Sequence, residues 1–101
     1  MPKRPRTARR AAAREHEEMV RDLERLAALA PGGSAERARE IESPAQVDVI
    51  ATATRCPVCD GPLLLEEHAA APGGRRTAHV RCTACGRRRA LHFRLAPPRL
   101  Q

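Results

Sequence analysis

Two short cysteine pairs constrain this chain more than any other feature. The first pair lies in CPVC, residues 56–59, the second lies in CTAC, residues 82–85, and 22 residues separate them. Zn²⁺ prefers four ligands at tetrahedral corners, and each C-x₂-C turn aims two thiolates at one point. The pattern therefore predicts one structural zinc ion. Its predicted ligands are Cys56, Cys59, Cys82 and Cys85.

Other uses of the cysteines fit less well. A thioredoxin-like redox pair belongs at the start of a helix in a βαβ unit, whereas a strand is expected after CPVC. A rubredoxin-like iron site uses similar ligands, but the chain has a single Phe and no Trp or Tyr to surround it. Disulfides belong to exported proteins, and the chain shows no apolar run for export or for crossing a membrane. We therefore expect a cytoplasmic protein without a membrane partner.

The charge of the chain is segregated. Its 101 residues carry 19 Lys+Arg and 12 Asp+Glu, a net charge of +7. Residues 1–14 hold six basic groups and no acid, residues 15–54 hold nine acidic and four basic groups, and residues 55–101 hold nine basic and three acidic groups. A basic tail and a basic cysteine-containing half suit a polyanionic partner, so charge favours contact with DNA or RNA.

The N-terminal part of the chain is expected to be helical. Residues 1–6, with two prolines and three cationic side chains, are predicted to form a disordered basic arm. Residues 7–43 are predicted to be a helical segment, with one helix over 7–30 that stops at PGG and a second over 34–42. An apolar stripe at spacings of four and three residues runs along the first helix, through Ala12, His16, Met19, Leu23, Leu26 and Ala30. The stripe predicts packing against the rest of the chain, a second copy or a protein partner.

Residues 44–101 are predicted to form the cysteine-containing domain. The segment 46–55 is ambiguous, because Ser43 and Gln46 fit a capping box while its five β-branched residues favour a strand. We predict a strand there. Further strands are expected over 62–68, 75–82 and 87–95.

At the cysteines the chain resembles the zinc ribbon family. The resemblance covers about residues 55–96 and rests on CPVCDG, an expected β-hairpin, CTACG and a following strand. In that family two cysteine turns clamp one zinc ion at the end of a small antiparallel sheet, so the resemblance implies this fold and this ligand set. The chain departs from the family at Asp60, where a glycine commonly follows the cysteine. The family serves transcription, translation, replication and protein–protein contacts, so the resemblance implies an architecture more than a role.

Together these expectations describe a small α+β protein. An N-terminal amphipathic helix and a short second helix precede an antiparallel Cys₄ zinc ribbon of three or four strands. Catalysis is not expected, because four thiolates leave zinc no open position and no nucleophile–base set or small-molecule site is evident.

Two functions follow from this architecture. In the first, a polar sheet face contacts nucleic-acid phosphates, and its candidate residues are His79, Arg81, Arg88, His92 and Arg94. In the second, the chain is an adaptor whose helix 7–30 binds a protein partner, with zinc serving only to hold the fold.

Overall fold

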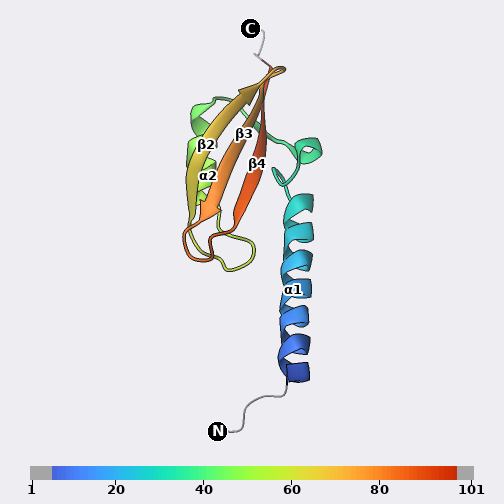
Figure 1. The fold of residues 1–101 in the computed structure, drawn as a ribbon. Coiled ribbons are helices and arrows are strands. Elements are labelled where there is room, and N and C mark those ends of the chain that lie inside the picture. The colour runs from blue at the N-terminus through green and yellow to red at the C-terminus, as the bar shows by residue number, and fades with distance from the viewer. Residues whose placement is uncertain (1–5, 98–101) are drawn as a thin grey trace.

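The computed structural model describes residues 6–97, in which one long helix precedes a small sheet covered by a second helix (Figure 1). The elements in chain order are α1 (Arg6–Leu29), the 3₁₀ turn η1 (Ala35–Arg37), β1 (Arg39–Ile41), α2 (Ala45–Ala53), β2 (Leu63–Ala71), β3 (Arg75–Cys82) and β4 (Arg88–Leu95). The expected fold class is confirmed, because helices and a mainly antiparallel sheet carry the four cysteines. The arm predicted over 1–6 lies outside the described residues except for Arg6, which begins α1.

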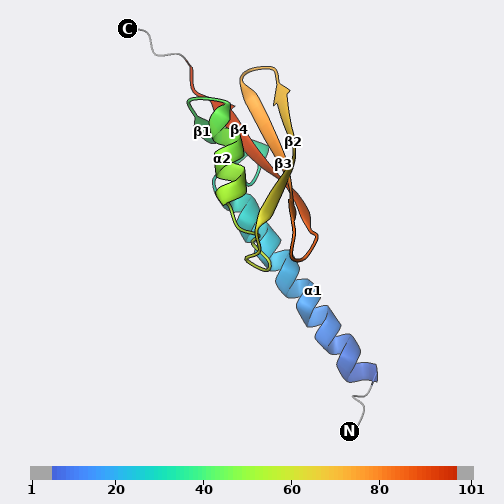
Figure 2. The same cartoon turned by 90° about the vertical axis from the view of Figure 1, so that its left-hand side faces the viewer.

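The sheet is a three-stranded antiparallel meander with one added parallel strand. Its spatial order is β1-β4-β3-β2, with β2 antiparallel to β3, β3 antiparallel to β4, and β1 parallel to β4. A register shift between Leu65 and Glu67 marks a β-bulge in β2. Helix α2 lies along one face of the sheet, and the opposite face, called here the open face, is not covered by α2 (Figures 1 and 2).

The core lies between α2 and the sheet. Leu63, Val80 and Phe93 are at most 5 % exposed, and the single aromatic ring of the chain belongs to this cluster. Val47 and Ala51 of α2 are fully buried against it. The cluster holds few large side chains, so its burial supplies modest stability.

Helix α1 extends away from the sheet. Both views show its N-terminal half running beyond the end of the strands, and only its C-terminal end approaches β4 (Figures 1 and 2). The Cα radius of gyration is 17.7 Å, against about 13 Å for a compact domain of this size. An ion pair of 4.0 Å between Glu24 and Arg89 connects α1 with β4. Among residues 6–97, no helix has the length and apolar character needed to cross a bilayer.

The apolar stripe predicted on α1 is not packed against the sheet. Val20, which lies beside the stripe, is the buried residue of the helix, and Leu23 is half-buried. Met19 and Leu26 are 50 % and 64 % exposed, and His16, predicted as a packing residue, is exposed. The helix therefore turns a different face toward the body than its heptad spacing predicts, and the stripe remains open along most of its length.

The helix predicted over 34–42 is wrong. One 3₁₀ turn covers 35–37, and the chain then becomes the strand β1, whose Ile41 is 3 % exposed. Ser34, the predicted N-cap, forms no capping hydrogen bond with its side chain. A helix this short has little stability of its own. Pairing with β4 instead satisfies a sheet edge and buries Ile41.

The strand predicted over 46–55 is also wrong, because these residues form α2. Half of the capping box considered for this segment exists: the Gln46 Oε1 accepts hydrogen bonds from the backbone N–H groups of Ser43 (3.2 Å) and Glu42 (2.6 Å), while the Ser43 Oγ accepts from the N–H of Ala45 (3.3 Å) instead of that of Gln46. Pro44 already has helical dihedral angles, which suits a first helical position. Thr52 and Thr54 donate their hydroxyls to carbonyls one turn earlier. Capping and burial of one face therefore outweigh the β-preference of the branched side chains.

Two valines of α2 test this assignment by the sign of their effects. Replacing Val49, which is 67 % exposed, with alanine is expected to stabilise the fold by about 0.5 kcal/mol, because alanine is the better helix former. Replacing Val47, which is 0 % exposed, with alanine is expected to destabilise the fold by about 1–3 kcal/mol. Guanidinium unfolding of the zinc-loaded protein measures both. A loss of stability in Val49→Ala would indicate a strand.

Candidate metal centre

The four predicted ligands converge at one end of the sheet. Their Sγ atoms all lie within 4.8 Å of one another, and this set is the four-cysteine cluster found among residues 6–97. Cys56 follows α2, Cys59 lies in the turn before β2, Cys82 ends β3, and Cys85 lies in the turn before β4. One turn of chain from each half of the ribbon therefore contributes two sulfurs.

The two cysteine turns have the same backbone hydrogen-bond pattern. In the first, the Cys56 N–H donates to the Gly61 carbonyl (2.9 Å) and the Asp60 N–H donates to the Cys56 carbonyl (2.9 Å). In the second turn, the Cys82 N–H donates to the Arg87 carbonyl (2.8 Å) and the Gly86 N–H donates to the Cys82 carbonyl (2.9 Å). The repeated CxxC spacing thus builds two equivalent turns that face each other.

Asp60 takes the conformation that Gly86 takes in the second turn. Its φ is 61° and that of Gly86 is 78°, both in the left-handed region. Aspartate tolerates this region better than most residues, so the departure from the family's usual glycine leaves the turn intact. An ion pair of 3.8 Å joins the Asp60 carboxylate to Arg55 beside the same turn.

Gly61 is required for a different reason, which is close approach. A Cβ at this position would lie 2.8 Å from the Ala84 Cβ, 2.9 Å from the Cys82 Sγ and 3.1 Å from the Cys59 Sγ. Gly61 is itself buried. The residue therefore leaves the room in which sulfurs from both turns come together.

The sulfur separations fit a tetrahedral thiolate site. The Cys56 and Cys85 sulfurs are 3.8 Å apart, and those of Cys59 and Cys82 are 3.4 Å apart. Zn–S bonds of about 2.3 Å at tetrahedral angles require sulfurs roughly 3.8 Å apart. A disulfide requires about 2.05 Å, and no disulfide joins any of the four cysteines. The donor set and its spacing therefore suit one metal ion such as zinc.

The local hydrogen bonds already favour one thiolate. The backbone N–H of Cys85, 3.4 Å from the Cys82 Sγ, is the main cause that lowers the pKa of Cys82 to about 6. The hydrogen bond with Cys82 raises the pKa of Cys59 to about 12, because Cys59 then keeps the shared proton. Metals bind thiolates, so this arrangement presents one ligand in its binding form.

The five residues predicted for nucleic-acid contact lie together on the open face. Cross-strand partners point to the same side of a sheet. In the register of β3 and β4, the pairs on this face are Arg81–Arg88, His79–Ala90, Thr77–His92 and Arg75–Arg94. The buried residues Ala78 and Val80 alternate with them and point toward α2. These five residues therefore share one polar face of the sheet.

The charges of the open face are partly compensated. The Glu66 carboxylate accepts from the Arg88 Nε (3.0 Å) and from the Arg81 Nε (3.4 Å), and Arg94 contacts Glu40 at 3.1 Å. Hydrogen bonding from Arg88 is the main cause that holds the pKa of Glu66 below its usual value. The single carboxylate of Glu66 thus pairs with two guanidinium groups, so Glu66, Arg81 and Arg88 together keep a net positive charge.

Sequence reasoning missed Glu66 as a bridging residue, and it left open whether Gly61 serves a positive φ or a close approach. Alternation along 62–68 already placed Glu66 opposite the core-facing leucines, and the hairpin pairing would have brought it beside Arg81. For Gly61 the sequence carried only the general signal of a glycine near a cysteine turn. Its contact with Ala84 and Cys82 depends on how the two turns face each other, which no local pattern encodes.

No family model, curated protein or solved structure matches this chain. The class of the protein is therefore defined by its own fold and site. It is a small α+β protein with a four-cysteine, zinc-ribbon-like site at the end of a four-stranded sheet.

Two glycine substitutions separate sulfur packing from backbone conformation. Gly61→Ala is expected to weaken zinc binding by at least tenfold, because the added methyl group displaces two sulfurs without removing a ligand. Gly86→Ala has open space around its Cβ and adds only left-handed strain of about 1–2 kcal/mol. Competition with a chromophoric chelator measures both affinities. Equal affinity of Gly61→Ala and the parent chain would contradict the close-approach role of Gly61.

Proposed function

We propose that this chain is a non-catalytic protein in which one structural zinc ion holds a basic ribbon that contacts nucleic-acid phosphates. The convergence of four sulfurs within 4.8 Å is the observation that carries the zinc site. Cys56, Cys59, Cys82 and Cys85 hold the ion, and four thiolates close its coordination shell. A closed shell leaves no position for water or substrate, so the metal supplies stability rather than chemistry.

The small core explains why the ribbon needs a metal. Its apolar cluster holds a single aromatic ring, and a ribbon of about 40 residues buries too little surface to offset chain entropy. Structural zinc contributes about 10–16 kcal/mol of apparent binding free energy in small modules at neutral pH. Metal binding and folding of the ribbon are therefore one event.

Metal removal tests this first step. We expect one zinc per chain by elemental analysis, and loss of dispersed amide signals from β2, β3 and β4 after chelation under reducing conditions. Cys82→Ser is expected to give the same loss, because it removes a ligand that is 0 % exposed. A chelated protein that keeps its β-sheet spectrum would overturn the zinc proposal.

The open face supports the nucleic-acid part of the proposal. It carries a net positive charge, and guanidinium groups present a planar fork that suits phosphate oxygens. The charged residues on it are Glu40, Glu66, Glu67, Arg75, Arg81, Arg88 and Arg94. No Phe, Tyr or Trp lies among them for base stacking, because the single Phe93 is 2 % exposed in the core. Contact with the phosphate backbone, without reading of bases, is the mode that this face suits.

A triple variant tests the open face. Changing Arg81, Arg88 and Arg94 to glutamine turns the charge of the face from positive to negative, so binding to nucleic acid at 50 mM salt is expected to weaken at least tenfold. The matched control changes Arg21, Arg25 and Arg37, three exposed arginines that belong to α1 and η1 and not to the strands, to glutamine. Fluorescence anisotropy with a labelled duplex measures both. The same small effect in both variants would count against the open face.

A second candidate function is that of an adaptor which binds a protein partner through α1. It is favoured by the exposure of Met19 and Leu26 on the apolar stripe. The variant with three substitutions on the open face distinguishes the two functions, because it leaves α1 unchanged and would spare an adaptor.

A further inference from the structure

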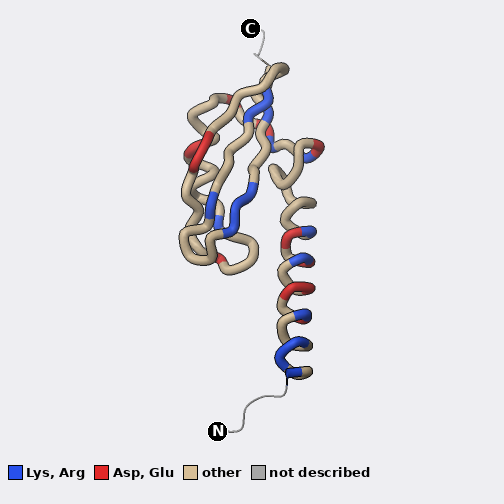
Figure 3. Tube along the Cα trace, viewed as in Figure 1, with Lys and Arg blue, Asp and Glu red and all other residues tan. Residues whose placement is uncertain are grey.

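The first nine residues of α1 form a strongly basic surface. Arg6, Arg9, Arg10 and Arg14 are all exposed, and residues 6–14 contain no carboxylate. Figure 3 shows basic residues with no acidic residue among them at this end of the helix, followed by a part that carries both acidic and basic residues. None of the ion pairs found among residues 6–97 involves these four arginines.

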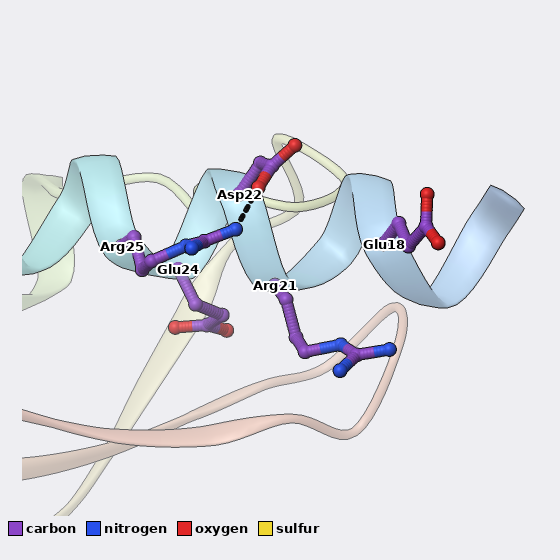
Figure 4. Close-up of a pocket in the computed structure, with 5 residues that line it drawn as sticks. All are labelled: Glu18, Arg21, Asp22, Glu24 and Arg25. Atoms are coloured by element: carbon purple, nitrogen blue, oxygen red, sulfur yellow. Dashed lines mark hydrogen bonds and ion pairs between the residues drawn. The ribbon is translucent and has the colours of Figure 1, made fainter. Parts of the chain in front are cut away.

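The following part of the same helix is different, because residues 15–29 carry five acidic and two basic groups. Arg25 pairs with Asp22 on the helix surface, and Glu24 contacts Arg89 of β4. Figure 4 shows Glu18, Arg21, Asp22, Glu24 and Arg25 around a shallow hollow on α1. The uncompensated positive charge of α1 is therefore confined to its N-terminal end.

Helix geometry gathers these arginines on one side. At about 100° per residue, the four side chains fall within an arc of roughly 140° over a length of about 12 Å. Ala13 also lies within this arc, and the rest of the circumference carries the small side chains of Thr7, Ala8, Ala11 and Ala12. Small residues let the helix axis come close to a partner, while the arginines reach to either side.

The arrangement is unfavourable for the free helix. Positive side chains stand at the end where the helix dipole is positive, and the first turn of α1 contains no acidic residue. Arg6, Arg10 and Arg14 also repel one another at a spacing of four residues. An anionic partner removes both penalties, which is charge complementarity of the kind that phosphates provide.

The shape of the free segment suits one kind of polyanion. An α-helix with side chains is about 10–12 Å wide, and the major groove of B-form DNA is about 12 Å wide. The major groove of an RNA duplex is too deep and narrow for a helix. In both views residues 6–14 lie beyond the end of the strands, so no strand lies beside this part of α1 (Figures 1 and 2).

We propose that residues 6–14 of α1 lie in the major groove of duplex DNA, with Arg6, Arg10 and Arg14 bound to backbone phosphates. The proposal rests on the nucleic-acid contact proposed above, and it adds the principal surface and the class of nucleic acid. The open face then has a secondary role in the same complex.

The test compares the full zinc-loaded chain with three variants that each lose three positive charges. The helix variant changes Arg6, Arg10 and Arg14 to Gln. The open-face variant changes Arg81, Arg88 and Arg94 to Gln, and the control changes Arg21, Arg25 and Arg37 to Gln. Glutamine is a good helix former, so α1 is retained, and circular dichroism checks this. Anisotropy with a 20-base-pair DNA duplex from 50 to 200 mM salt gives the slope of log affinity against log salt.

We expect the helix variant to reduce the magnitude of this slope by about 2.7, or 0.9 for each lost phosphate contact, and the control to leave it unchanged. A variant with lysine at positions 6, 10 and 14 keeps the charge and is expected to keep the slope. DNA duplex is expected to bind more tightly than RNA duplex or single strands of the same sequence.

The negative outcomes separate the two proposals. If the helix variant and the control behave alike while the open-face variant loses binding, the helix proposal is wrong and the nucleic-acid function stands. Tighter binding of RNA duplex than of DNA would overturn the major-groove placement. Absence of any binding at 50 mM salt by the parent chain would overturn both.

Discussion

The convergence of four sulfurs at one end of the sheet is the constraint on which the rest of the structure depends. The cysteine turns join the exit of α2, the start of β2 and the connection from β3 to β4, so a metal ion there ties α2, β2, β3 and β4 together. The hydrogen-bond pattern shared by the two turns, and the absence of a side chain at Gly61, allow that convergence. The sheet behind it then needs only a thin apolar cluster around Phe93.

Because the sheet is held in this way, the surface of α1 is available for a separate function. Because the metal and the α2 face hold the sheet, α1 contributes little to the core, and its exposed surface is available for other contacts. Its charges differ from those of the open face. On the sheet, Glu66 and Glu40 form ion pairs with arginines and offset part of their charge, whereas residues 6–14 contain no acidic residue. The two basic surfaces therefore differ in how much of their charge remains available to a partner.

Local sequence patterns correctly predicted the elements whose conformation depends only on residues nearby in the sequence. The spacing of the cysteines predicted their convergence, the strand β3 was predicted with its observed bounds, and alternation placed Arg81, Arg88 and Arg94 on one face. The segments 34–42 and 46–55 exchanged helix for strand, because their conformation depends on distant partners. Ile41 pairs beside β4, and Val47 packs on the sheet, neither of which a short sequence window contains. The buried side of α1 was misassigned for the same reason.

The parallel strand β1 also changes what the sheet exposes. By covering the outer side of β4, it leaves β2 as the remaining long border, where unpaired backbone groups invite another chain to add itself. The bulge between Leu65 and Glu67 interrupts that border near its middle and twists it locally. A protein that is small and poor in large side chains thereby gains protection against the edge-to-edge stacking that leads to fibrils.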